Sequence, residues 1–183
     1  YTKDIIEKIN ILGPIPVKSI YSGFVTFLKN LKEKNLTKEY TSFAYDWRKR
    51  PEDIIDSNSI KQIEDMAARS TNGKVSIVAH SYGGFLAKEI LLRLLQSNKK
   101  HLIDKVILLG VPESGAPAAL FSSMHGEGQS ILGGLLLKAS TAMRFAVNLP
   151  SIYMLMPALN FEHPIIVSLK YIDNSASEQF TQI

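Results

Sequence analysis

Residues 75–84 constrain the fold of this chain more than any other segment. An apolar run rich in β-branched residues leads into Ser81, and two glycines follow it. An apolar pattern with helical spacing then starts at once. This order predicts a buried strand, a sharp turn and a helix, with Ser81 at the apex of the turn. The small residues Ala79 and Gly83 are expected where helix and strand nearly touch, because a larger side chain at either position would clash.

A serine at the apex of a strand–turn–helix is typical of the nucleophile elbow of α/β-hydrolases. We expect the Tyr82 N–H, at the start of the helix, to point toward the place where a tetrahedral oxyanion would form. Two simpler explanations compete, since Ser81 could cap the helix and Gly83-Gly84 could be an ordinary packing turn. A capping serine does not explain small residues on both sides. A phosphate-binding loop fits worse, because its lysine and its glycine spacing are absent.

The composition predicts a single domain over residues 1–183. The chain is 45% hydrophobic and 21% charged. Its length suffices to bury a core without the help of disulfides or structural metals. It has no cysteine, which excludes disulfides, thiolate catalysis and cysteine-based zinc sites. No group of His, Asp and Glu has the spacing of metal ligands, so we expect no metal and no other cofactor.

The charge pattern argues against a nucleic-acid partner and against a membrane span. The net charge is +4, but acidic and basic residues are mixed, as in residues 29–34, which favours a solvated helix face. No aromatic residues interleave the basic ones, as a single-strand binder would require. The most apolar segment, residues 131–149, is interrupted by Lys138 and Arg144. It therefore predicts a buried or interfacial helix rather than a transmembrane one.

Periodicity predicts alternating helices and strands up to residue 110. We expect helices over residues 19–34, 51–70 and 83–98, and strands over residues 40–47, 74–80 and 105–110. This order indicates an α/β fold with a mostly parallel sheet, covered by helices on both faces in three layers. The carboxyl ends of the strands would share one edge, where ligands bind in such sheets. Trp47, Ser81 and Val111 would all emerge there.

The pattern loosens after Gly110. The sequence predicts a loop over residues 111–117, a polar segment over 122–130 and a helix over 131–148. A further segment, 149–155, begins at a proline break, and residues 164–171 could form a strand. Hydrolases of this class usually keep a cap over the acyl pocket after this strand. We therefore expect a cap or lid over residues 111–160.

Three segments carry a more specific resemblance. They are residues 43–48 (Phe-Ala-Tyr-Asp-Trp-Arg), 79–84 (Ala-His-Ser-Tyr-Gly-Gly) and 109–117 (Leu-Gly-Val-Pro-Glu-Ser-Gly-Ala-Pro), with a weaker fourth match at 149–157. In order and spacing they resemble the lecithin–cholesterol acyltransferase family and its lipase-like relatives. The resemblance implies an α/β-hydrolase that attacks lipid ester carbonyls through an acyl-serine intermediate, at a membrane or lipoprotein surface. The acyl group would then pass to water or to an alcohol.

The resemblance also implies roles for individual residues. Ser81 matches the family's nucleophile, and Tyr82 supplies one backbone amide of the oxyanion hole. Asp46-Trp47-Arg48 matches a signature at the rim of the site. Two interpretations of it stay open, a pocket role and a core tryptophan with a strand-end ion pair. Where the family loop often reads Pro-His-x-Gly-Ser-Pro, residues 112–117 read Pro-Glu-Ser-Gly-Ala-Pro, so no function of that histidine transfers.

The chain offers no complete set of partners for the serine. A serine nucleophile needs a histidine and a carboxylate, which follow it in α/β-hydrolases as acid and then histidine. The downstream histidines are His101, His125 and His163, and none follows a carboxylate in a strand-end setting. Asp104 begins its strand, at the wrong end of the sheet. Asp173 is in a setting like that of the family's acid, but no histidine follows it.

We therefore expect the chain to be a fragment that lacks the acid, the histidine and the upstream loop with the second oxyanion donor. His80, beside the nucleophile, is expected to pack rather than to catalyse, because alternation along a strand points it away from the serine Oγ. Other functions stay open. They are another esterase, a thioesterase or a lipid-anchor deacylase of the same fold, or a catalytically dead relative that serves as a binding module. The sequence does not fix the compartment.

Overall fold

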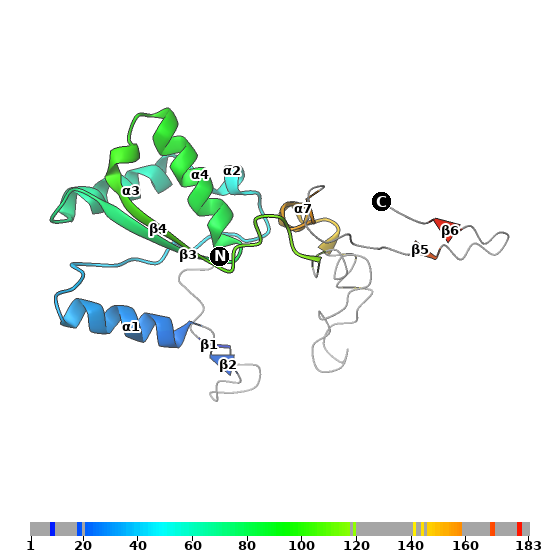
Figure 1. Cartoon of the computed structure of the whole chain (residues 1–183), viewed down its shortest axis with the longest axis horizontal. Helices are drawn as coiled ribbons and strands as arrows, with labels where there is room; N and C mark the ends of the chain where they lie inside the picture. The colour runs from blue at the N-terminus through cyan, green and yellow to red at the C-terminus, as the bar shows by residue number, and fades with distance from the viewer. Residues whose placement is uncertain are drawn as a thin grey trace. The chain divides into compact units, whose positions relative to one another are not determined.

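The computed structural model describes residues 21–117, 119, 141, 144 and 146–158, and the backbone of residues 8–9, 18–19, 169–170 and 179–180. The chain divides into two compact units, Tyr1–Val111 and Pro112–Ile183, which are described separately below (Figure 1).

The first unit contains a parallel pair of strands. In chain order its elements are β1 (Lys8–Ile9), β2 (Lys18–Ser19), α1 (Ser22–Glu33), α2 (Pro51–Ile54), α3 (Ser57–Arg69), β3 (Val75–His80), α4 (Gly83–Gln96), the 3-10 helix η1 (Lys100–Leu102) and β4 (Ile103–Leu109). β1 and β2 pair in antiparallel fashion. β3 and β4 are parallel, with Val75 opposite Ile103 and His80 opposite Leu109. The carboxyl ends of β3 and β4 therefore meet at one edge of the pair, as predicted.

The core of this unit lies between α4, α3 and β3. Leu86, Ile90 and Leu94 follow one another at intervals of four residues, so they form one stripe along α4. They are at most 5% exposed. Ala67 of α3 and Ala79 of β3 are buried as well, and α4 contacts both α3 and β3 (Figure 1). This packing fixes the helix that starts next to Ser81.

The opposite face of the strand pair is only partly covered. Val78, Ile107 and Leu109 point to this face and are 42–46% exposed. Tyr21, just before α1, reaches the same face, where it hydrogen bonds to His80. The strand predicted over residues 105–110 therefore forms as β4, but the expectation that it is buried is wrong for the part of the chain described here. The apolar run indicates a strand that can be buried on both faces, but burial depends on what covers it.

The strand predicted over residues 40–47 does not form. Within the described residues this segment pairs with neither β3 nor β4. A strand requires a hydrogen-bonded neighbour, and side-chain alternation alone does not provide one. The predicted helix 19–34, strand 74–80 and helix 83–98 are confirmed as α1, β3 and α4, each shortened at one or both ends.

The single helix predicted over residues 51–70 is two helices. α2 ends at Ile54, and Asp56 then begins α3 as its N-cap. The Asp56 carboxylate accepts a hydrogen bond from the Ser59 N–H at 2.8 Å, and the Asp56 N–H donates to the Ser59 hydroxyl at 3.3 Å. This reciprocal capping box starts a new helix.

The second unit is described in part. It contains α7 (Pro150–Met154) and the antiparallel pair β5 (Leu169–Lys170) and β6 (Gln179–Phe180). The predicted segments 122–130 and 131–148 lie wholly or mostly outside the described residues, as do His125, His163 and Asp173. The cap or lid over residues 111–160 therefore stays a prediction. Among the helices that the structure describes, none has the length and apolar character needed to cross a membrane.

The α4 stripe yields a stability prediction. Leu94→Ala should lower the free energy of unfolding by about 2–5 kcal/mol, because Leu94 is fully buried and its removal leaves a cavity. Leu95→Ala is the matched control, since Leu95 is 57% exposed and should change stability by less than about 0.5 kcal/mol. Urea unfolding of the intact protein measures both. Equal losses would contradict this assignment of the core.

Candidate active site

Ser81 has an unusual backbone conformation. It follows β3 directly, and its φ is +52°, in the left-handed region that costs a residue with a side chain about 1–2 kcal/mol. The Ser81 N–H donates to the Leu109 carbonyl at 3.0 Å, and the Ser81 carbonyl accepts from the Gly84 N–H at 3.0 Å. The serine is therefore held between the end of the strand pair and the first turn of α4. Its position matches the sharp turn predicted from the sequence.

The Tyr82 N–H lies at the start of α4, where backbone donors have no partner within the helix. In the described part of the chain no backbone carbonyl accepts a hydrogen bond from it. The Tyr82 carbonyl, by contrast, accepts from the Phe85 N–H at 3.1 Å. The amide next to Ser81 can therefore donate to an anion that forms there.

The glycine that the turn requires is Gly84, not Gly83. A Cβ on Gly83 would lie 4.0 Å from the Ala79 Cβ and 3.8 Å from the Tyr45 hydroxyl, which is ordinary contact. The clash expected at Gly83 is therefore wrong for a methyl group. A Cβ on Gly84 would lie 2.9 Å from the Val111 Cβ and closer still to both Val111 methyl carbons. Val111, two residues after the end of β4, thus packs directly on the backbone of α4.

This contact predicts different effects for two neighbouring substitutions. Gly84→Ala should lower the free energy of unfolding by about 1–3 kcal/mol, as overpacking does. Gly83→Ala should change it by less than about 1 kcal/mol, since the space is free. Urea unfolding distinguishes them. The packing of Val111 on α4 would be refuted if Gly83→Ala were the more damaging variant.

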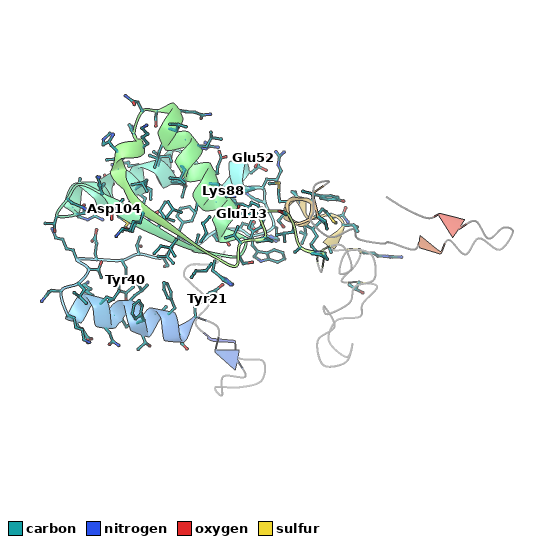
Figure 2. The ribbon with its side chains drawn as sticks, viewed as in Figure 1. Tyr21, Tyr40, Glu52, Lys88, Asp104 and Glu113 are labelled. Atoms are coloured by element: carbon teal, nitrogen blue, oxygen red, sulfur yellow. The ribbon has the colours of Figure 1, made fainter. Side chains whose placement is uncertain are left out.

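His80 faces away from the turn, as alternation along β3 predicts. Its Nδ1 lies 2.7 Å from the Tyr21 hydroxyl, and the two rings meet edge to face with centroids 5.7 Å apart. Figure 2 places Tyr21 at the end of the strand pair where β3 leads into Ser81. The described partner of His80 is therefore a tyrosine from the start of α1.

Asp46, Trp47 and Arg48 form an exposed turn. Arg48 binds both carboxylate oxygens of Asp46, with Nε at 2.7 Å from Oδ1 and Nη2 at 2.8 Å from Oδ2, and its backbone N–H adds a bond of 3.2 Å. These bonds lower the pKa of Asp46 to about 2. Trp47 is 53% exposed. The second of the two open interpretations is thus wrong for the tryptophan, which is not in the core, while the Asp46–Arg48 ion pair forms in a turn rather than at a strand end. The pocket role stays a prediction.

The Asp46–Arg48 pair predicts a pH-dependent change in this turn. The pKa of Asp46 is lower in the folded protein than its usual 3.8. The stabilisation from the pair is therefore present above about pH 4 and lost as the pH falls through about 2. We expect the emission of Trp47, the chain's single tryptophan, to change in this range. Asp46→Asn should abolish the change, whereas Asp53→Asn should keep it, and an unaltered transition in Asp46→Asn would exclude Asp46 as its source.

The Tyr82 side chain joins this turn to the serine. Its hydroxyl donates to the Lys49 carbonyl at 2.7 Å, and the Lys49 N–H donates to the Asp46 carbonyl at 3.1 Å. This link was not predicted from the sequence, because spacing along the chain gives no signal for a bond between residues 33 positions apart. Tyr45 lies nearby, with its ring centroid 6.3 Å from that of Tyr82. Burial, and then the charge of nearby Tyr21, raises the pKa of Tyr45.

His101 and Asp104 lie far from this site within the first unit. His101 is exposed in η1, and Asp104 is the second residue of β4. The strand register puts this end of β4 opposite Val75, at the start of β3. Figure 2 shows Asp104 at that end of the pair, away from Tyr21. Neither residue is brought to Ser81.

In the second unit, two of the matched segments lie together. The Ala116 N–H donates to the Leu155 carbonyl at 2.8 Å, and the Ala158 N–H donates to the Ser114 carbonyl at 2.9 Å. Gly115, between them, has a φ of +93°, and a Cβ there would lie 2.5 Å from the Pro157 Cα. The loop 112–117 is therefore tied to the segment after α7. Among the described residues, no three His, Asp or Glu side chains gather as a possible metal site.

Comparison with known proteins agrees with these motifs. The family model for lecithin:cholesterol acyltransferase matches residues 7–181. The chain belongs to this family. This membership implies the α/β-hydrolase fold, and the parallel pair β3–β4 with its helices is consistent with part of such a fold.

Two curated relatives in the family are phosphatidylcholine-sterol acyltransferases. The mouse protein is 34% identical over 111 residues, which cover 58% of this chain and 25% of the relative. The rat protein is 32% identical over 120 residues, which cover 62% of this chain and 27% of the relative. The chain thus matches about a quarter of the length of each. No solved structure matches it significantly.

Proposed function

We propose that Ser81 is the nucleophile of a lipid ester hydrolase or O-acyltransferase. The observation that carries this proposal is the left-handed backbone of Ser81 between a parallel strand and a helix, which is the geometry of a nucleophile elbow. Membership of the lecithin:cholesterol acyltransferase family supports a lipid ester as substrate. The names of the mouse and rat relatives support a phospholipid as acyl donor and a sterol as acceptor.

The reaction proceeds in two steps. The Ser81 Oγ attacks the ester carbonyl, and the tetrahedral oxyanion accepts a hydrogen bond from the Tyr82 N–H, a donor worth up to a few kcal/mol in such sites. The intermediate collapses to an acyl-serine and releases the alcohol part of the donor. Water or an acceptor alcohol then attacks the acyl-serine and frees Ser81.

The serine requires a general base and a carboxylate that orients it. The two histidines that the structure describes do not fit this role. His80 is bonded to Tyr21, and His101 lies at the far end of the strand pair. We therefore place the base and its carboxylate outside the described residues. The second oxyanion donor belongs there too.

A fluorophosphonate tests this proposal. The Ser81 Oγ forms a bond to phosphorus, the P–F bond breaks, and fluoride leaves together with the serine proton. The intact protein should be labelled at Ser81. Ser81→Ala should lose the label and at least about a thousandfold of its activity. Ser76→Ala is the matched control, since Ser76 is an exposed serine of the same strand, and it should be labelled normally.

Product analysis separates hydrolysis from transfer. Phospholipid vesicles without a sterol should yield free fatty acid, and vesicles that contain a sterol should yield sterol ester, through the same Ser81-dependent activity. A protein that binds the vesicles but shows neither labelling nor product is a binding module, and the enzyme proposal then fails.

A further inference from the structure

The side chain of Tyr82 is held by contacts to its ring and by a hydrogen bond from its hydroxyl. The residue is 8% exposed. Its ring lies against Tyr45 with centroids 6.3 Å apart, and against Phe85 in an edge-to-face contact with centroids 5.7 Å apart. Its hydroxyl donates to the Lys49 carbonyl at 2.7 Å. A buried hydroxyl that lost this bond would incur its full desolvation cost, so the bond fixes the ring in one orientation.

The segment that Tyr82 holds is otherwise on the surface. Lys49 closes the turn that starts at Asp46 and contains the exposed Trp47. A second bond from α4 reaches the next residues, where Arg93 Nη2 donates to the Glu52 carbonyl at 3.0 Å. The side chains of Tyr82, at the N-cap of α4, and of Arg93, within α4, therefore both bind the backbone of residues 49–52. The Tyr82 bond is the one that connects directly to Ser81.

We propose that the Tyr82 side chain is a positioning residue, which locks the oxyanion-donating N–H of its own backbone by bonding to Lys49. The orientation of that N–H depends on the peptide plane between Ser81 and Tyr82. The Ser81 carbonyl in the same plane accepts a hydrogen bond from the Gly84 N–H at 3.0 Å, which opposes rotation of the plane about the line joining the two Cα atoms. The ring is anchored across 33 residues of sequence, so the Tyr82 Cα, at the other end of this plane, also stays in place. The inference rests on the proposed role of Ser81.

The hydrogen bond from the Tyr82 hydroxyl to the Lys49 carbonyl can form over a wide pH range. Burial, and then the charges of Tyr45, Glu52 and Asp53, raises the pKa of Tyr82 to about 12. The hydroxyl therefore stays protonated, and able to donate, wherever a serine enzyme is assayed. Preorganised donors stabilise an oxyanion because they need not reorient during the reaction. A rigid Tyr82 amide meets this condition.

The test is Tyr82→Phe, which keeps the ring and removes the hydroxyl. In the intact protein, the second-order rate constant for fluorophosphonate labelling of Ser81 should fall about 2- to 10-fold, the usual net effect of one hydrogen bond. The kcat for a soluble ester should fall by the same factor, with KM unchanged. Ser97→Ala is the control, since it removes a hydroxyl-to-carbonyl bond of 2.8 Å at the other end of α4. Its labelling rate should stay normal.

A second readout follows the turn itself. The fluorescence of Trp47 is obtained as the difference between the wild type and Trp47→Phe. The anisotropy decay of this fluorescence reports the local motion of the Trp47 side chain. Tyr82→Phe should increase the fast component of this decay, whereas Ser97→Ala should not. Lys49→Ala should leave both readouts unchanged, because the acceptor is the backbone carbonyl.

The outcomes separate the two proposals. If Ser81 of the wild type is labelled and Tyr82→Phe is labelled equally fast, the positioning role is wrong and the role of Ser81 stands. A rise in KM without a fall in kcat also overturns the positioning role. If the wild type is not labelled at Ser81, the proposed function itself fails. In that case the anisotropy decay of Trp47 still decides whether the Tyr82 hydroxyl restricts the motion of the turn at residues 46–49.

Discussion

The backbone of Ser81 is the constraint on which the rest of the described structure depends. Its left-handed φ lets the chain pass from β3 into α4 within two residues, Ser81 and Tyr82. Hydrogen bonds to Leu109 and from Gly84 hold this conformation from both sides. The cost of about 1–2 kcal/mol for such a backbone is offset by the buried stripe of α4, which fixes the helix against β3. A stable helix thus maintains a strained residue, as is common at functional sites.

Segments distant in sequence contact the residues next to Ser81, each by a different kind of contact. Val111 packs on the bare backbone of Gly84. Tyr82 holds the turn at Lys49 by a buried hydrogen bond. Tyr21, from the start of α1, binds the imidazole of His80. The turn at Ser81 is therefore supported by van der Waals contact, by a hydrogen bond to the backbone and by a side-chain pair. Because these contacts differ in kind, single substitutions can separate their effects on stability from those on reactivity.

Local patterns predicted the elements around the site well. The expected strand 74–80 and helix 83–98 differ from β3 and α4 by one or two residues at an end, because apolar periodicity records which face of a segment is buried. The predictions failed where a partner decides the outcome. Residues 40–47 alternate like a strand but pair with neither described strand of the sheet, and Ile107, Leu108 and Leu109 of β4 stay exposed. The break at Asp56 was missed because residue 55 continues the apolar pattern, while the capping bonds of Asp56 and Ser59 end it.

The sequence by itself determined that a serine stands at a turn between a parallel strand and a helix, with the motifs of one lipid acyltransferase family around it. Such features depend on residues close together in the chain, whose spacing and chirality restrict the backbone directly. Only the tertiary structure decided that Gly84 rather than Gly83 must lack a side chain, that Trp47 is exposed and that Tyr82 holds Lys49. Each of these depends on which residues distant in sequence the folded chain brings near, and spacing along the chain does not record that.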